Sequence, residues 1–186
     1  RRDEVQAQKI IDADVEIDRM EVEIEEDCLK VLALYQPVAV DLRFIVSVLK
    51  INNDLERIGD LAVNIAERAI FLAAQPRQYD PLDIPLISEK AQVMLKNSLD
   101  ALVNADLELA REVCAADDEV DVLNRGMHDK VRAEIRKNIE VLQGASQVLD
   151  VSRFLERIAD QATNIAEDVI YMVEGQIIRH HHESHQ

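Results

Sequence analysis

The chain has 186 residues, of which 37 are acidic and 21 are Lys or Arg, giving a formal net charge of −16 at pH 7. This charge argues against duplex DNA, RNA or an anionic membrane as the main partner, because those surfaces require clustered Lys and Arg. It also disfavours a bare phosphate pocket. Only four Gly and four Pro occur, and no β-branched alternation is visible, so the composition predicts an all-helical chain.

Two further features predict a soluble, cytoplasmic protein. No apolar stretch approaches the roughly 20 residues that a membrane span needs. Cys28 and Cys114 are isolated in helical apolar patterns, which indicates core packing in a reduced compartment.

In the first half of the chain, apolar spacing predicts a helix from about residue 14 to 34. Residues 3–13 are expected to be the end of a preceding helix or a turn. Pro37 is suited to starting a second helix that runs from 38 to about 74, because its missing N–H is not needed there. Residues 76–85 contain three prolines and form the expected linker.

In the second half, we expect helices over about 86–114, 117–136 and 139–173, followed by a polar tail over 177–186. Asn138 is the expected N-cap of the last helix, and Gly175 is its expected end. Gly144 competes with Asn138 for the turn. We prefer Asn138 because it places acidic pairs of the two flanking helices level with each other.

An internal repeat organises the chain. Residues 53–67 and 153–167 share the pattern L-E-R-I-x-D-x-A-x-N-I-A-E, with apolar positions three and four apart. Glu56 and Asp60 are neighbours on one helix, as are Glu156 and Asp160. Such like-charged neighbours cost about 0.2–0.5 kcal/mol per pair. The repetition of this cost suggests that a cation lies between the acids.

A second pair of acids precedes each copy, again four residues apart. In an antiparallel hairpin, residues equidistant from the turn lie side by side. Each hairpin would therefore bring four carboxylates to one height, which is a metal-site geometry. The predicted ligands are Asp14, Asp18, Glu56 and Asp60 in the first cluster and Asp117, Asp121, Glu156 and Asp160 in the second. Arg57, Asn64, Arg157 and Asn164 are candidates for positions just outside the ligands, with surface ion pairs as the alternative for the two arginines.

Carboxylate oxygens suit Mg, Mn, Fe or Zn. Neither cluster contains a His, which argues against a ferritin-like di-iron centre and against redox catalysis. The alternative is that these acids are paired by chance on a solvent-exposed helix face and bind no metal. The His residues of the tail could bind metal, but we prefer to explain them as a remnant purification sequence or a disordered native tail. No nucleophile–base arrangement and no phosphate-binding glycine loop is legible, so we expect no enzymatic activity.

The segments 36–43 and 49–60, together with the second L-E-R-I-x-D copy at 155–160, resemble the signature of the PhoU family. The resemblance covers nearly the whole chain. It implies two tandem antiparallel three-helix bundles, at residues 1–75 and 86–176, separated by the linker. The family has another long helix before the first acidic pair, where only about a dozen residues stand here. We therefore expect the first bundle to lack most of its first helix.

The resemblance also implies a function. PhoU proteins are non-enzymatic negative regulators of phosphate-starvation signalling and phosphate uptake. They connect a phosphate ABC transporter, through its ATPase subunit, with a phosphate-sensing histidine kinase. Metal binding by the acidic motifs is implied, with iron or zinc favoured over manganese or magnesium. A homodimer is expected, with no nucleic acid bound and the membrane reached only through partners. The alternatives from other classes are a carboxylate-bridged metalloenzyme and a metal-free helical scaffold.

Overall fold

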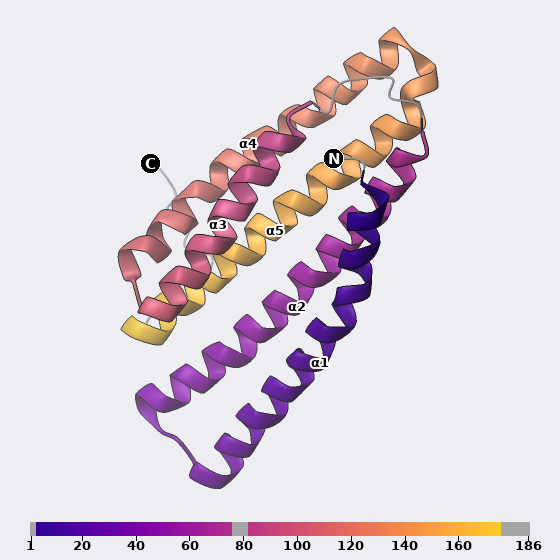
Figure 1. Ribbon diagram of the computed structural model, residues 1–186. Helices are drawn as coiled ribbons and strands as arrows, with labels where there is room; N and C mark the ends of the chain where they lie inside the picture. Colours follow the sequence, from indigo (N-terminus) through magenta and orange to yellow (C-terminus); the bar gives the residue numbers. More distant parts are fainter. Residues whose placement is uncertain (1–2, 76–81, 176–186) are drawn as a thin grey trace, which may run out of the picture.

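The computed structural model describes residues 3–75 and 82–175, and within these ranges the chain is helical without strands. The helices are α1 (Glu4–Tyr35), α2 (Ala39–Ala73), α3 (Ile84–Asn104), α4 (Leu107–Lys137) and α5 (Leu142–Glu174), with a short 3-10 turn η1 (Ile139–Val141) before α5. They form an elongated assembly of an α1–α2 hairpin beside an α3–α4–α5 bundle (Figure 1). The predicted all-helical class is confirmed.

Helix α1 is longer than the sequence analysis predicted. It begins at Glu4, because the Asp3 side chain caps it by accepting a hydrogen bond from the backbone N–H of Gln6 at 3.0 Å. The expectation that residues 3–13 form a separate helix end or a turn is therefore wrong. The helix ends at Gln36, whose left-handed backbone has φ 46°. Helix α2 then starts at Ala39, so Pro37 lies in the turn and not in the helix.

The expected helix over 86–114 is present, but its predicted end is wrong by ten residues. Helix α3 ends at Asn104, and Ala105 adopts a left-handed conformation with φ 51°. The Asp106 carboxylate accepts hydrogen bonds from the backbone N–H groups of Glu108 and Leu109, at 3.0 and 3.1 Å. This cap starts α4 at Leu107, ten residues before the predicted start at 117. The apolar spacing continues through this position, but the capping by Asp106 ends one helix and starts the next.

The turn between α4 and α5 lies at Asn138 as predicted, but a short 3-10 turn precedes the last helix. The Asn138 side chain accepts a hydrogen bond from the backbone N–H of Glu140 at 2.9 Å, which starts η1. Gly144 lies inside α5. Helix α5 ends at Gly175, which has φ 74° and donates its N–H to the Tyr171 carbonyl at 2.9 Å. Asn138 therefore caps η1, whereas α5 itself begins at Leu142, three residues later than predicted, and Gly175 caps its C-terminal end.

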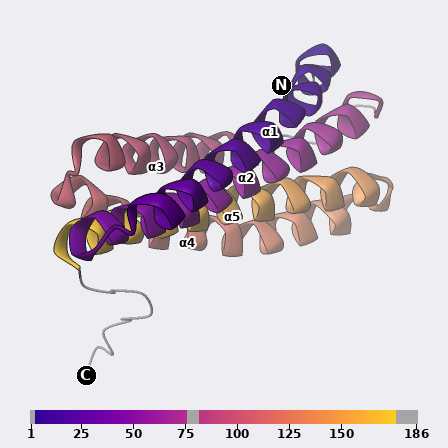
Figure 2. The same ribbon diagram turned by 90° about the horizontal axis from the view of Figure 1, so that it is seen from below.

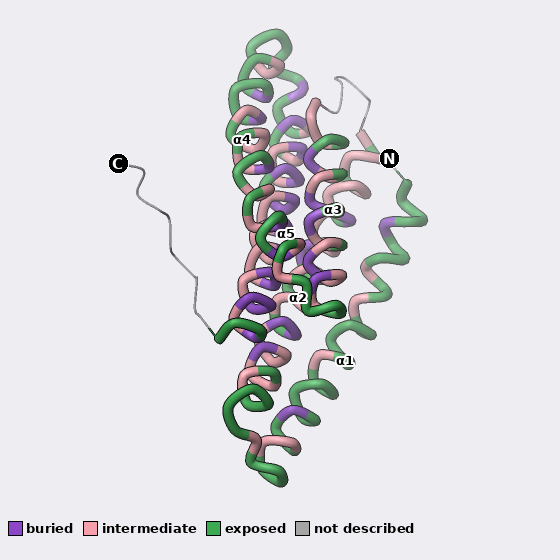
Figure 3. Tube along the Cα trace, turned by 90° about the vertical axis from the view of Figure 1, so that its left-hand side faces the viewer, coloured by how far each residue is buried: buried purple, intermediate pink, exposed green. Residues whose placement is uncertain are grey.

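Helix α5 lies at the centre of the fold. It packs against α2, α3 and α4, whereas α1 contacts only α2 among the described helices (Figures 1 and 2). The main core joins α3, α4 and α5 and includes Leu61 of α2. In contrast, α1 buries only Ala7 and Cys28, and most of its length is exposed (Figure 3).

The predicted division into domains stays a prediction. The part of the linker over 76–81 and the tail over 177–186 lie outside the described residues. No helix in the described ranges is both long enough and apolar enough to cross a membrane.

Candidate functional site

The first predicted cluster lies between α1 and α2. Burial, followed by the charges of Asp18 and Asp60, raises the pKa of Asp14 above its usual value. Burial also raises the pKa of Glu56, followed by the charges of Asp60 and then Asp18. Such charge effects act only between groups that lie near one another. The hairpin therefore brings the four predicted carboxylates into one region of the α1–α2 pair.

Gly59 allows the two helices to approach at this level. A Cβ on Gly59 would lie 3.1 Å from Asp14 Oδ1 and 3.2 Å from Ile17 Cδ1, which is tighter than ordinary packing. The position has a small residue in both repeats, since its counterpart is the fully buried Ala159. A small side chain here keeps the Asp14 carboxylate close to the α2 backbone.

The second cluster lies between α4 and α5 and is more deeply buried. The pKa of Asp117 rises to about 6 through burial and then the charges of Asp160 and Asp121. The pKa of Asp160 also rises to about 6, through burial and then the charges of Glu156 and Asp121. Glu156 shows a raised pKa from burial, Asp121 and Asp117. All four predicted carboxylates converge here as well.

The deeper burial of the second cluster follows from the packing of the helices. Helix α3 packs against both α4 and α5, and α5 also packs against α2, so more of the protein surrounds this hairpin. Among the described residues, no third helix covers α1 and α2 in the same way. The like charges of the second cluster are therefore less screened by water.

Sequence analysis missed Glu21, whose charge is among those that raise the pKa of Glu56. Glu21 lies three residues after Asp18, one turn further along the same face of α1, and this spacing could have identified it. The backbone around it is fixed by Asn52, whose side-chain N–H donates to the Glu21 carbonyl at 2.8 Å. In the second hairpin, the Ser152 hydroxyl donates to the Asn124 side chain at 2.7 Å.

The residues predicted to lie just outside the ligands differ in position. Arg157 lies beside the second cluster, where its charge lowers the pKa of Glu156 and Asp160. The Asn64 amide donates to the Asp60 carbonyl of its own helix at 2.7 Å. Arg57 is exposed and Asn164 is half-buried. Their role outside a metal shell stays a prediction.

Comparison with known proteins identifies the family. A sequence model of the PhoU domain matches residues 1–69 and again 84–169. The chain belongs to the PhoU family. It is 41% identical over 176 residues to the phosphate-specific transport system accessory protein PhoU homologue of Aquifex aeolicus, a match that covers 95% of this chain and 80% of that protein.

Other relatives agree. The PhoU homologue of Pseudomonas aeruginosa is 41% identical over 180 residues, covering 94% of this chain and 72% of that protein. The crystal structure of PhoU from Pseudomonas aeruginosa matches with a TM-score of 0.92 at 36% identity, covering 94% of this chain and 84% of that one. The phosphate transport system regulatory protein PhoU from Streptococcus pneumoniae matches with a TM-score of 0.86 at 27% identity, covering 95% and 83%.

Whether the two clusters suit a metal ion can be tested on their chemistry. Each provides at least four carboxylates, and none of the eight predicted ligands forms a salt bridge with a Lys or Arg in the described ranges. In the present side-chain arrangement, no three His, Cys, Asp or Glu of the described residues surround a common point at metal-binding distance. The donor set thus fits a hard or borderline cation, and binding would require side-chain rotation.

A cysteine adjoins the second cluster of this PhoU-family chain. Burial, with the charges of Glu167 and Asp117, raises the pKa of Cys114 to about 11, so its thiol is protonated at neutral pH. Because only the thiolate is a strong ligand, Cys114 adds no donor to the cluster as it stands.

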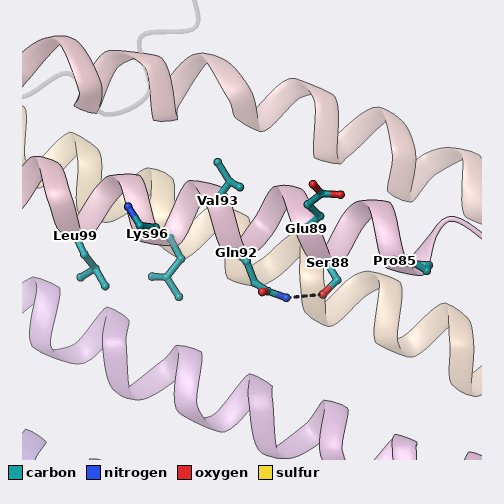
Figure 4. A pocket seen from close by; sticks show the side chains of 8 residues that line it. Pro85, Ser88, Glu89, Gln92, Val93, Lys96 and Leu99 are labelled. Carbon is teal, nitrogen blue, oxygen red and sulfur yellow. Dashed lines mark hydrogen bonds between the residues drawn. The ribbon is translucent and has the colours of Figure 1, made fainter. Parts of the chain in front are cut away.

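A hollow of about 690 Å³ lies on α3, between Pro85 and Leu99, apart from both clusters (Figure 4). It contains none of the predicted ligands, and its polar groups include a Gln92-to-Ser88 side-chain hydrogen bond of 2.9 Å. The hollow is open and mostly apolar, and the ammonium of its Lys96 is already paired with Asp100 at 2.6 Å.

Proposed function

We propose that this chain is a non-enzymatic, cytoplasmic regulator of phosphate uptake that keeps phosphate-starvation signalling off when phosphate is plentiful. It would act as a homodimeric adaptor between a phosphate ABC transporter, through the ATPase subunit, and a phosphate-sensing histidine kinase. The names of its relatives, accessory proteins of a phosphate-specific transport system, support the link to phosphate transport.

The observation that carries the metal part of the proposal is that each hairpin gathers four carboxylates, none of which forms a salt bridge in the described ranges. In the second cluster the pKa values of Asp117 and Asp160 reach about 6, first because burial removes them from water and second because like charges lie beside them. A bound cation would relieve this repulsion. Iron or zinc is the proposed occupant, with manganese or magnesium as the alternative.

The proposed role of the metal is structural or regulatory. The alternative, a carboxylate-bridged metalloenzyme, would have to use a carboxylate of the cluster itself as its proton acceptor. His128, the only His in the described ranges, is exposed on α4. The same acids, clamped by a cation, would instead fix α1 on α2 and α4 on α5. The shape presented to a protein partner would then depend on metal loading.

The proposal is tested in a bacterium that lacks its own PhoU and carries a phosphate-starvation reporter. In high phosphate, expression of this chain should repress the reporter. Asp117→Asn, Asp121→Asn, Glu156→Gln and Asp160→Asn, combined in one variant, should lose most of that repression at equal protein level. Asp118→Asn, which changes an exposed acid beside the cluster, should repress like the parent.

Two outcomes bear against the proposal in different ways. Failure of the parent chain to repress the reporter would contradict the regulatory function. Full repression by the combined variant, with normal helicity, would leave regulation intact and remove the second metal cluster from it.

A further inference from the structure

The two repeats meet along a single pair of helices. Helix α2 packs against α5, and among the described helices no other contact joins the α1–α2 hairpin to the α3–α4–α5 bundle. The two helices lie side by side and run in opposite directions (Figures 1 and 2). Whatever determines how the repeats associate must therefore lie on this joint.

One ion pair of the joint is almost fully buried on its acidic side. Lys50 Nζ of α2 lies 3.3 Å from Asp168 Oδ1 of α5, whose side chain is only 1% exposed. The same ammonium lies 5.0 Å from the centre of the Tyr171 ring. A buried carboxylate is tolerated only with such a partner, because its transfer from water costs several kcal/mol.

A second ion pair lies further along the joint. Arg68 Nε of α2 is 3.9 Å from Asp150 Oδ2 of α5, and the guanidinium lies 6.0 Å from the centre of the Phe154 ring. Asp150 also pairs with Arg153 of its own helix, at 3.1 Å. Both inter-repeat pairs thus place a cation of α2 against an acid and an aromatic ring of α5.

The two ion pairs are related by the internal repeat, with their charges exchanged. The repeat shift of 100 positions places Lys50 at the level of Asp150 and Arg68 at the level of Asp168. Both pairs fit the same antiparallel alignment of α2 with α5. Arg68 follows Lys50 along α2 by as many residues as Asp150 precedes Asp168 along α5. Equivalent positions of the two helices therefore carry opposite charges.

This exchange matters because α2 and α5 carry the same L-E-R-I-x-D-x-A-x-N-I-A-E segment and thus similar packing surfaces. A copy of α2 could therefore compete for the place of α5. In such a pair of α2 helices from two chains, Lys50 would face Arg68. In a pair of α5 helices, Asp150 would face Asp168. Like charges facing each other in a packed joint are strongly unfavourable.

We propose that these two oppositely oriented ion pairs make the joint selective, so that α2 associates with α5 and neither helix associates with its own copy in a second chain. This arrangement of charges disfavours pairing of α2 with a second α2 and of α5 with a second α5. Both ion pairs stabilise the pairing of α2 with α5.

The test exchanges the charges of one pair or of both in the full-length chain. Lys50→Asp with Asp168→Lys keeps an ion pair at that place, but each helix now carries one charge of each sign, so like-with-like pairing also becomes favourable. Adding Arg68→Asp and Asp150→Arg makes α2 wholly acidic and α5 wholly basic at these positions, which restores the selectivity. The proteins are refolded from denaturant at increasing concentration, and their masses are measured by sedimentation velocity.

We expect the one-pair exchange to form a species of twice the parent mass, and the fraction of protein in this species should be at least tenfold larger than for the parent. The two-pair exchange should have the same mass distribution as the parent. A one-pair exchange with the parent's mass distribution at every concentration would overturn the proposal, as would equal association of both exchanges. Circular dichroism checks folding. If the exchanged chains do not fold, the variant Lys50→Met with Asp168→Leu is used, because its apolar side chains leave no two like charges facing each other in a pair of identical helices. This variant must show the same increase in association.

Discussion

Asp117 and Asp160 show at the level of single side chains what the fold imposes on its acids. Both pKa values rise from 3.8 to about 6, with burial as the largest cause. A carboxyl whose pKa is higher in the folded state binds more protons when folded. Its contribution to the free energy of unfolding is therefore largest below about pH 4 and falls as the pH rises through about 6. Without metal, this cluster destabilises the protein at neutral pH.

Replacing one of these acids should consequently stabilise the metal-free protein at neutral pH. Asp117→Asn should raise the free energy of unfolding at pH 7 by about 1 kcal/mol, a value reduced for the partial exposure of the group. It should also flatten the loss of stability between about pH 4 and 7. Chemical denaturation in the presence of a chelator, at several pH values, measures both effects.

Asp118→Asn is the matched control, because Asp118 is exposed one position away. It should change the free energy of unfolding by less than about 0.5 kcal/mol. If Asp117→Asn destabilised the chelated protein at pH 7, or left its pH dependence unchanged, the electrostatic account of the cluster would be wrong.

At the scale of the helices, periodicity predicted their existence, and local capping decided where they end. Asn138 was identified because it stands between two patterns whose acids must be level. Asp106 was missed because the apolar pattern continues through it, although its carboxylate caps α4 with two hydrogen bonds. The continuation of α1 to Glu4 depends on the Asp3 cap, a short-range signal that a period search does not weigh.

Two glycines inside helices should respond differently to alanine. Gly126 of α4 has no atom within 4 Å of an added Cβ, so Gly126→Ala should stabilise the protein by about 0.5–1 kcal/mol through helix propensity. At Gly59 the same substitution meets Asp14 Oδ1 at 3.1 Å, and displacing that carboxylate should cancel the gain. Denaturation of both variants in a chelator measures the difference. Equal stabilisation by the two substitutions would show that Gly59 does not constrain the approach of α1.

At the scale of the whole molecule, the repeat allowed the hairpins and the two acidic clusters to be predicted, because each depends on residues at regular spacing along neighbouring helices. The joint between α2 and α5 could not be predicted in this way. Its contacts, such as that between Lys50 and Asp168, join residues far apart in sequence, and the repeat relates them only once the antiparallel packing of α2 on α5 is known. The greater burial of the second cluster likewise depends on how the other helices pack around α4 and α5, and helix spacing does not encode that packing.

The central claim is that the two carboxylate clusters hold metal ions, and metal content tests it most directly. The parent for this measurement has His180, His181, His182 and His185 changed to Ala, so that the tail cannot contribute. Elemental mass spectrometry after supply of iron, zinc, manganese and magnesium, followed by desalting, should find metal bound to this parent. Replacing the four acids of one hairpin by Asn and Gln should remove only the metal that is bound by that cluster. Replacing the acids of both hairpins should remove all of the bound metal. An unchanged metal content in the variant that lacks both clusters, or no metal in a folded parent, would contradict the claim.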